Sequence, residues 1–164
     1  MINIPEIKIK ISFKNKRATD KLFKIGGAED AYAAFKEIFN ADTFKWTEEM
    51  ILLCLDSANN IKGFYKVGIG GITATIADVR VIFCIALNCC ATAIIIAHNH
   101  PSGSLKPSEA DIAQTEQIKN AGALLNINLM DHLILSEDGF YSFTAQEIFL
   151  NKYEKKNGKR KATA

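Results

Sequence analysis

The residues best suited to chemistry lie between positions 98 and 111, in the run HNHPSGSLKPSEAD. His98 and His100 end a predicted buried strand, and residues two apart on a strand point to the same side of it. Asp111 falls in the first turn of the next predicted helix. Two imidazoles and one carboxylate suit a catalytic zinc ion with an open fourth position. Zinc in such a site lowers the pKa of a bound water towards neutrality.

The same residues also have a structural interpretation. Ser108 and Asp111 match the pattern in which a serine caps a helix N-terminus and an acidic residue three positions later completes the cap. A lone histidine near a strand end is usually just a partly buried polar residue. The residues alone leave both interpretations open, and a non-haem iron site would use the same ligand types.

Other metal-dependent signatures are absent from the sequence. The His-x-His-x-Asp-His pattern of metallo-β-lactamases fails, because Ser102 and Gly103 occupy its aspartate and final histidine positions. The chain has no His-Glu-x-x-His and no Pro-Cys-x-x-Cys, which excludes the zincin and base-deaminase signatures.

Hydrophobic periodicity and turn residues predict the elements that must position this segment. We expect helices over 29–40, 78–89, 108–121 (with Gly122 near the end of the last) and 145–153. We expect strands over 7–13, 50–55, 61–69, 93–97, 127–135 and 140–143, with 61–69 returning as a hairpin. Mixed strands and helices in this order predict one α/β (α+β) domain, built on a mixed β-sheet flanked by helices.

Composition is ordinary for one globular domain, with 164 residues of which 48% are hydrophobic and 23% charged. The net charge is +2. Residues 1–28 carry seven basic and two acidic side chains, and residues 152–161 carry six and one. The rest of the chain is therefore acidic, which argues against a main folded face that grips phosphates. The basic ends predict a solvated tail or a loose contact with nucleic acid.

Cysteine usage and hydropathy predict a cytoplasmic protein. The four cysteines, Cys54, Cys84, Cys89 and Cys90, form no Cys-x-x-Cys pair and lie in apolar runs, so we expect buried, reduced thiols. The N-terminus shows no apolar signal core. Residues 81–105 lack charged side chains, but Asn88 and the polar run from His98 interrupt them. We therefore expect no membrane association.

The chain resembles the JAMM (MPN-type, JAB-type) metalloprotease superfamily, because His98, His100, Ser108 and Asp111 meet its His-x-His-x7-Ser-x2-Asp pattern. Within that superfamily it resembles the RadC family. The similarity continues through Ala121-Gly122 and Asp131-His132-Leu-Ile to Tyr141-Ser-Phe. It covers roughly residues 28–148.

The resemblance implies a deaminase-like JAMM/MPN fold, which we place over residues 28–150. The residue patterns predict a strand and loop before it at 1–27 and a basic, flexible tail after it at 151–164. It implies Zn2+ held by His98, His100 and Asp111. It also implies that Ser108 stabilises the tetrahedral oxyanion, and that a glutamate from an upstream strand acts as general acid and base. The family has long carried a DNA-repair label, which does not establish its biochemical activity.

Two adjacent residues compete for the role of that glutamate. In RadC-like chains it stands eight residues before the aspartate of a Leu-Asp turn, and counting back from Asp56 gives Glu48. Strand alternation says only that Glu48 and Glu49 face opposite sides of the sheet. We predict Glu48, with a solvated charge at the start of the strand as the alternative for either residue.

The sequence departs from the family in two places. RadC chains usually carry Val-His-Pro-Arg-Glu before the central helix, where this chain has Ile-Ala-Asp-Val-Arg at 76–80, so its substrate can differ. Full-length RadC proteins also have an N-terminal helix-hairpin-helix region, for which the residues before the first predicted helix are too few. The chain is in this respect similar to short RadC-like proteins of mobile elements, and the argument for DNA contact is weaker.

These observations support two hypotheses from different classes. The first is a zinc-dependent hydrolase that cleaves a peptide or isopeptide bond in a peptide or protein substrate, with Glu48 and Ser108 as catalytic residues. The alternative is a non-enzymatic nucleic-acid-associated or scaffold module with a structural or vestigial metal. His132 follows Asp131 on a predicted strand, and it either orients a metal ligand or serves as a structural histidine. The sequence does not indicate an oligomeric state.

Overall fold

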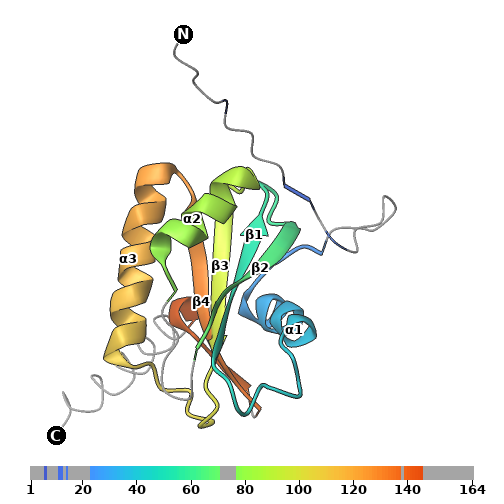
Figure 1. The fold of residues 1–164 in the computed structure, drawn as a ribbon, viewed down its shortest axis with the longest axis vertical. Helices are drawn as coiled ribbons and strands as arrows, with labels where there is room; N and C mark the ends of the chain where they lie inside the picture. Colours follow the sequence, from blue (N-terminus) through green and yellow to red (C-terminus); the bar gives the residue numbers. More distant parts are fainter. Residues whose placement is uncertain are drawn as a thin grey trace, which may run out of the picture.

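The computed structural model describes residues 23–70, 77–137 and 139–145, together with positions 6, 11, 12 and 14. Its helices are α1 (Ala28–Ile38), α2 (Val79–Asn88) and α3 (Glu109–Leu125). Its strands are β1 (Glu49–Leu55), β2 (Ile61–Ile69), β3 (Ala93–Asn99), β4 (Asn128–Ser136) and β5 (Gly139–Ser142). The strands form one five-stranded mixed sheet in the order β2-β1-β3-β4-β5, which confirms the predicted fold class (Figure 1).

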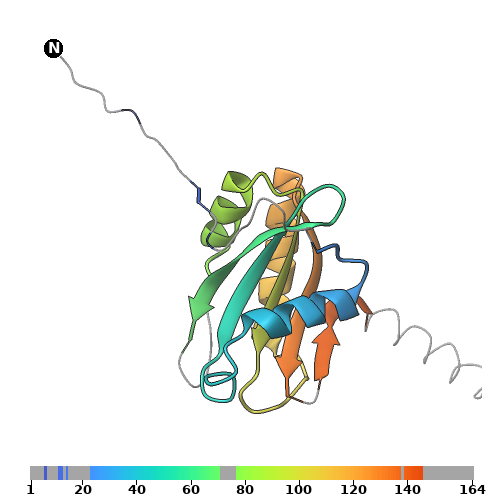
Figure 2. The same cartoon turned by 90° about the vertical axis from the view of Figure 1, so that its right-hand side faces the viewer.

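The helices cover both faces of the sheet. Helix α1 lies on one face, and α2 and α3 lie on the other (Figure 2). The central strands β1 and β3 are therefore buried on both sides, as their continuous apolar sequences predict. Alternate residues of β1 pack into two separate cores: Ile51, Leu53 and Leu55 against α1, and Met50, Leu52 and Cys54 towards α2.

Strand direction sets the geometry of the central strands. β1 runs antiparallel to β3, with Met50 opposite His98, and β3 runs parallel to β4 through the α3 crossover. Paired residues on neighbouring strands point to the same face of a sheet. His98 consequently shares the α2/α3 face with Met50, and this register decides which upstream residues can approach His98.

The predicted hairpin between β1 and β2 is confirmed, and its turn is built by Asp56. The Oδ1 atom of Asp56 accepts hydrogen bonds from the backbone N–H groups of Ala58 and Asn60, at 2.8 and 2.9 Å. Hydrogen bonds from the side chain and backbone of Asn60 hold the pKa of the Asp56 carboxyl below its ordinary value. Asn59 takes the left-handed conformation with a φ of 63°, which asparagine tolerates better than most residues.

Helix α3 continues four residues beyond the predicted end at Ala121, because Asn126 rather than Gly122 provides the left-handed C-cap, with a φ of 55°. Gly122 lies inside the last turn for a different reason. A Cβ atom at Gly122 would overlap the backbone carbonyl oxygen of Ile127 and would stand 3.3 Å from Cζ of Phe83. The missing side chain therefore allows α3 to approach both α2 and the start of β4.

The prediction for the cysteines is partly wrong. All four thiols are free, and Cys54 is buried, but Cys84 and Cys90 are exposed. Cys84 lies on the outer side of α2, whose buried residues are Ile82, Phe83 and Ala86, and Cys90 lies in the turn that follows. Burial, with a further contribution from nearby Cys89, raises the pKa of the Cys54 thiol to about 12.

Some expectations fall outside the described residues. Most of the strand predicted over 7–13 and nearly all of the helix predicted over 145–153 lie there, as does the predicted tail at 151–164. The domain boundaries at 27 and 150 remain predictions. Within the described ranges, none of the helices combines the length and hydropathy needed to cross a bilayer.

The close approach at Gly122 predicts a measurable cost of adding one methyl group. We expect Gly122→Ala to lower the free energy of unfolding by about 1–3 kcal/mol, the usual cost of overpacking, despite the roughly 1 kcal/mol that alanine gains in helix propensity. Urea denaturation measures the difference. Ala123→Gly, at the exposed neighbouring position, is the control and should lose about 1 kcal/mol. A Gly122→Ala protein as stable as wild type would show that α3 does not approach Ile127 and Phe83 this closely.

Candidate metal centre

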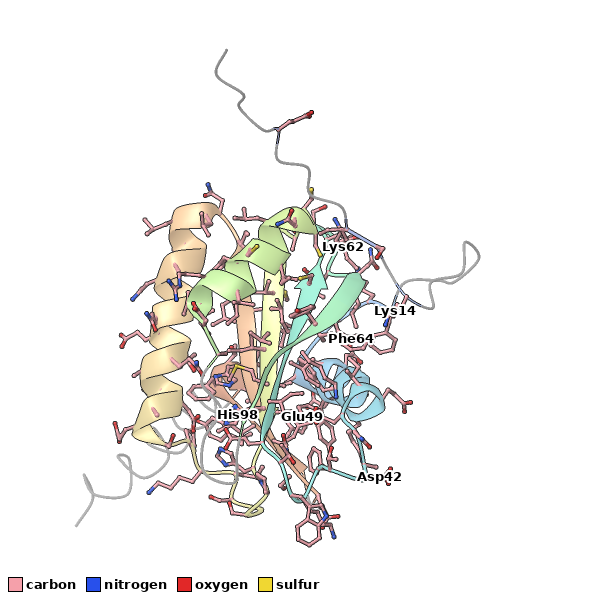
Figure 3. The ribbon with its side chains drawn as sticks, in the orientation of Figure 1. Lys14, Asp42, Glu49, Lys62, Phe64 and His98 are labelled. Carbon is pink, nitrogen blue, oxygen red and sulfur yellow. The ribbon has the colours of Figure 1, made fainter. Side chains whose placement is uncertain are left out.

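His98, His100 and Asp111 come together at the end of β3. Their ligand atoms all lie within 4.8 Å of one another. His98 Nε2 is 2.9 Å from His100 Nε2 and 3.2 Å from Asp111 Oδ1, and His100 Nε2 is 3.7 Å from Asp111 Oδ2. Figure 3 shows His98 at the end of the sheet that faces the start of α3. The structure therefore brings together the three residues that the sequence predicts as metal ligands.

The two histidines reach the same side because the extended backbone continues past the last residue of β3. The backbone N–H of His100 donates to the carbonyl oxygen of Leu135 at 2.9 Å, which holds residue 100 beside β4. The His98 side chain is fully buried, while those of His100 and Asp111 are 15% and 12% exposed. The cluster is thus embedded on one side and accessible on the other.

Asp111 is held in place by the helix cap that the sequence suggests. The Ser108 hydroxyl accepts from the backbone N–H of Asp111 at 3.2 Å, while Asp111 Oδ2 accepts from the backbone N–H and the hydroxyl of Ser108, both at 2.7 Å. This capping box uses Oδ2 and leaves Oδ1 directed at His98. The capping interpretation and the metal-site interpretation of Ser108 and Asp111 are therefore compatible.

The electrostatics keep the Asp111 carboxyl ionised. Burial alone would raise the pKa of this group, but hydrogen bonding with His98 and Ser108 outweighs burial and holds the pKa well below its ordinary value. The stability that these bonds contribute is present above the ordinary carboxyl pKa and is lost as the pH falls through the lower, folded-state pKa. At neutral pH the cluster therefore contains a carboxylate ready to bind a cation.

Hydrogen bonding also aims the imidazole of His100. Its Nδ1 lies 2.6 Å from the backbone carbonyl oxygen of Ser104. A carbonyl oxygen only accepts, so Nδ1 carries the proton, and in the neutral ring Nε2 presents a lone pair to the cluster. His98 uses its own Nδ1 to contact His132 Nε2 at 2.8 Å, which leaves the Nε2 atom of His98 facing His100 and Asp111.

The donor set fits a divalent metal ion. Two ring nitrogens and a carboxylate oxygen that converge this closely need positive charge between them, supplied either by a metal ion or by a proton. Imidazole and carboxylate ligands suit zinc, and three protein ligands leave a position for water or substrate. In the described part of the chain no cysteine belongs to this cluster.

The contacts of Glu49 place it on one side of the sheet, and strand alternation predicts the opposite side for Glu48. The Glu49 carboxylate accepts from Lys66 Nζ at 2.7 Å and from Thr43 Oγ1 at 3.3 Å, on the face covered by α1. Since Met50 faces the α2/α3 side with His98, alternation predicts that Glu48 faces that side too. The Gly70 N–H donates to the Glu48 carbonyl at 2.8 Å, which extends the strand pairing to this residue.

Asn99 is a structural element of the site that sequence reasoning missed. Its side chain is fully buried, and its Nδ2 donates to the carbonyl oxygens of Phe44 and Thr47 at 2.7 and 2.9 Å. Its Oδ1 accepts from the backbone N–H of Glu49 at 2.8 Å. Asn99 therefore fastens the loop that leads into Glu48 to the strand that carries His98. Its place between two predicted ligands was the only signal, because its partners lie some fifty residues away.

His132 lies in contact with the cluster, and its environment keeps its ring neutral. Burial lowers the pKa of His132 well below the ordinary histidine value, and the nearby His98 lowers it further. Thr115 contacts the other ring nitrogen, with Oγ1 at 2.6 Å from Nδ1. The sequence left the role of His132 open and gave none to Thr115, although Thr115 follows Asp111 by four residues and so lies on the same face of α3.

A mixed sheet between helices, with a His-His-Asp cluster at the end of a central strand, is the arrangement expected of a JAB-type domain. A sequence model of the RadC-like JAB domain matches residues 25–148. The chain therefore belongs to the RadC-like JAB domain family, as the motif predicted.

Two similar curated relatives are named by the family designation UPF0758. A UPF0758 protein of Flavobacterium johnsoniae is 40% identical over 138 residues, which cover 83% of this chain and 59% of the relative. A UPF0758 protein of Porphyromonas gingivalis is 42% identical over 118 residues, which cover 72% of this chain and 52% of the relative. The chain thus spans about half the length of the curated relatives that it matches.

The cluster predicts metal uptake that depends on its three residues. We expect the protein to take up zinc in a one-to-one ratio, measured by elemental analysis after zinc loading and desalting. His100→Ala should lose most of this zinc, because two protein ligands hold the ion far more weakly than three. Uptake should also fall at acidic pH, since the ligands must be deprotonated to bind.

The control for this prediction is Cys84→Ser, which removes an exposed thiol outside the cluster and should leave the zinc content unchanged. A His100→Ala protein that binds as much zinc as wild type would place the metal elsewhere.

Proposed function

We propose that the protein is a zinc-dependent hydrolase that cleaves peptide or isopeptide bonds in a peptide or protein substrate. The observation that carries the proposal is the convergence of His98, His100 and Asp111. The pairing of Met50 with His98 supports the choice of Glu48, because strand alternation from Met50 predicts the same sheet face for Glu48. A metal site with a carboxylate on its own side of the sheet has the parts that hydrolysis requires. A merely structural zinc site usually has four protein ligands and no open position.

His98, His100 and Asp111 would hold the ion through Nε2, Nε2 and a carboxylate oxygen. When bound, zinc supplies a Lewis acid that polarises the scissile carbonyl and lowers the pKa of water towards neutrality. The partly exposed side of the cluster, formed by His100 and Asp111, is where substrate would approach. The buried His98 ring anchors the site in the sheet and excludes solvent behind it.

Glu48 is the proposed general acid and base. A carboxylate beside the reacting water can take its proton and then deliver that proton to the leaving amine. Glu49 is unsuited to this role, because its carboxylate is held by Lys66 and Thr43 on the other side of the sheet. Asn99 supports Glu48 indirectly, since it fixes the backbone of the adjacent residue.

Ser108 is the proposed donor to the oxyanion that develops on the substrate. This role comes from the family resemblance, and a hydroxyl aimed at developing negative charge lowers the barrier to acyl transfer. The Ser108 hydroxyl donates to Asp111 Oδ2 in this structure. Donation to a substrate would require the hydroxyl proton to turn away from Asp111, while the capping bond from the Asp111 N–H persists.

A nucleic-acid-associated module with a structural metal is the second candidate, with a role in DNA repair or in a mobile element. The basic composition of residues 1–28 and 152–161 favours it. This function would give a DNA affinity that falls steeply with salt and that does not depend on Glu48. The four free cysteines suit a cytoplasmic location under either proposal.

Matched substitutions at Glu48 and Glu49 test the proposed hydrolase activity and the role of Glu48 in it. We expect the zinc-loaded protein to cleave members of an internally quenched library of peptides and lysine-linked isopeptides. Glu48→Gln should retain zinc but lose activity by about 10²–10⁴-fold, the usual contribution of a general acid or base. Glu49→Gln should remain active, because Glu49 faces away from the cluster.

Fluorescence measures the cleavage, and elemental analysis confirms the zinc content of each variant. Full activity in zinc-loaded Glu48→Gln would remove Glu48 from the mechanism. No cleavage by wild type, together with salt-dependent DNA binding, would favour the second candidate.

A further inference from the structure

We propose that His132 and Thr115 are positioning residues that fix the His98 ring and tie it to the element carrying Asp111. This inference rests on the proposed metal centre and extends it by two residues outside the ligand set. It is carried by a continuous chain of short hydrogen bonds, which begins at one candidate ligand and ends at the backbone of another.

This chain of hydrogen bonds, which we call the relay, has three links, and all of them lie inside the fold. His98 Nδ1 lies 2.8 Å from His132 Nε2. The second nitrogen of that ring, His132 Nδ1, lies 2.6 Å from Thr115 Oγ1. Thr115 Oγ1 in turn lies 2.6 Å from the backbone carbonyl oxygen of Asp111. The relay therefore joins β3, β4 and α3 directly behind the cluster of candidate metal ligands.

The direction of each hydrogen bond follows from the last link. A carbonyl oxygen cannot donate, so the single hydroxyl proton of Thr115 points to Asp111. Thr115 Oγ1 must then accept from His132 Nδ1–H. In the neutral tautomer that carries its proton on Nδ1, His132 Nε2 has a lone pair and accepts from His98 Nδ1–H. With that proton fixed on Nδ1, the neutral His98 ring presents its Nε2 lone pair to the cluster, as a metal ligand must.

The ring of His132 is itself held by the fold. It is fully buried and stacks on Phe143, with the ring centroids 4.8 Å apart and the planes 6° from parallel. Its neighbour Asp131 accepts from the His132 backbone N–H at 2.8 Å and from the Ser142 hydroxyl at 2.6 Å. The relay is therefore anchored on the strand pair β4–β5 and has little freedom to adjust.

A relay of this kind stabilises a bound metal in two ways. It removes the competing tautomer of His98, and it fixes the spacing between a ligand on β3 and the helix turn that carries Asp111. Partners behind metal ligands commonly contribute 10–100-fold in affinity, by order of magnitude. A histidine with a purely structural role would contribute to folding stability and would leave the metal affinity of the folded protein unchanged.

Substitutions at both relay positions separate these roles. His132→Phe keeps the ring volume and the stacking on Phe143 but removes the acceptor for His98. Thr115→Val keeps the shape of Thr115 but removes the hydroxyl, whereas Thr115→Ser restores it. We expect His132→Phe and Thr115→Val to weaken zinc binding by about 10–100-fold in folded protein, and Thr115→Ser to stay close to wild type.

Competition with a chromophoric chelator measures these affinities, and the visible spectrum of the Co2+ form reports the geometry of the ligands. The matched control is Ile118→Val, a buried change on α3 outside the relay, which should lower folding stability without changing zinc affinity. Wild-type affinity and an unchanged Co2+ spectrum in both His132→Phe and Thr115→Val would overturn the proposal.

A second measurement needs no metal and so separates this proposal from the proposed function. NMR of the ring nitrogens in metal-free protein, above the ordinary histidine pKa, reports which nitrogen of His132 is protonated. We expect the proton on Nδ1, with its signal altered in Thr115→Val. A proton on Nε2 would overturn the relay even if zinc binds. Failure of wild type to bind zinc would instead overturn the metal centre, while the tautomer still decides the hydrogen-bond chain.

Discussion

The central constraint on this structure is the convergence of two imidazole nitrogens and a carboxylate within a few ångströms. His98 Nε2 and His100 Nε2 are 2.9 Å apart, and Asp111 Oδ1 is 3.2 Å from the first of them. Lone pairs this close repel unless a cation or a proton lies between them. The fold must therefore hold these groups together against repulsion when neither a cation nor a proton lies between them, and a cation that binds there stabilises the native state.

Each ligand is held by an interaction with a different part of the fold. His98 is fixed from behind by His132, and His100 by the backbone carbonyl of Ser104. Asp111 is fixed by the helix cap that Ser108 provides. Asn99 points to the opposite face and holds the loop that leads to Glu48. The site is therefore rigid because β3, β4 and α3 each contribute hydrogen bonds, and substitution of a single partner should disturb one ligand before the others.

Much of this arrangement follows from local sequence patterns. Alternation and apolar runs predict the sheet strands, and the spacing of His98, His100 and Asp111 predicts their meeting. Local patterns carry no information on strand register, so the sequence separates Glu48 from Glu49 only by family spacing. The Met50–His98 pair supports the proposed choice of Glu48. The His132–Thr115 contact joins two elements that no local pattern connects. Gly122 was predicted to lie near the helix end, but its role depends on the approach of Ile127, which sequence does not reveal.

X-ray absorption at the zinc edge of the loaded protein tests whether His98, His100 and Asp111 bind the ion, because it reports the atoms around the metal. We expect a four-coordinate shell of nitrogen and oxygen at about 2.0–2.1 Å, with the outer-shell scattering of two imidazole rings and no sulfur. A sulfur contribution at about 2.3 Å would show that cysteines bind the ion. A shell without imidazole scattering would likewise contradict the assignment of His98 and His100 as ligands.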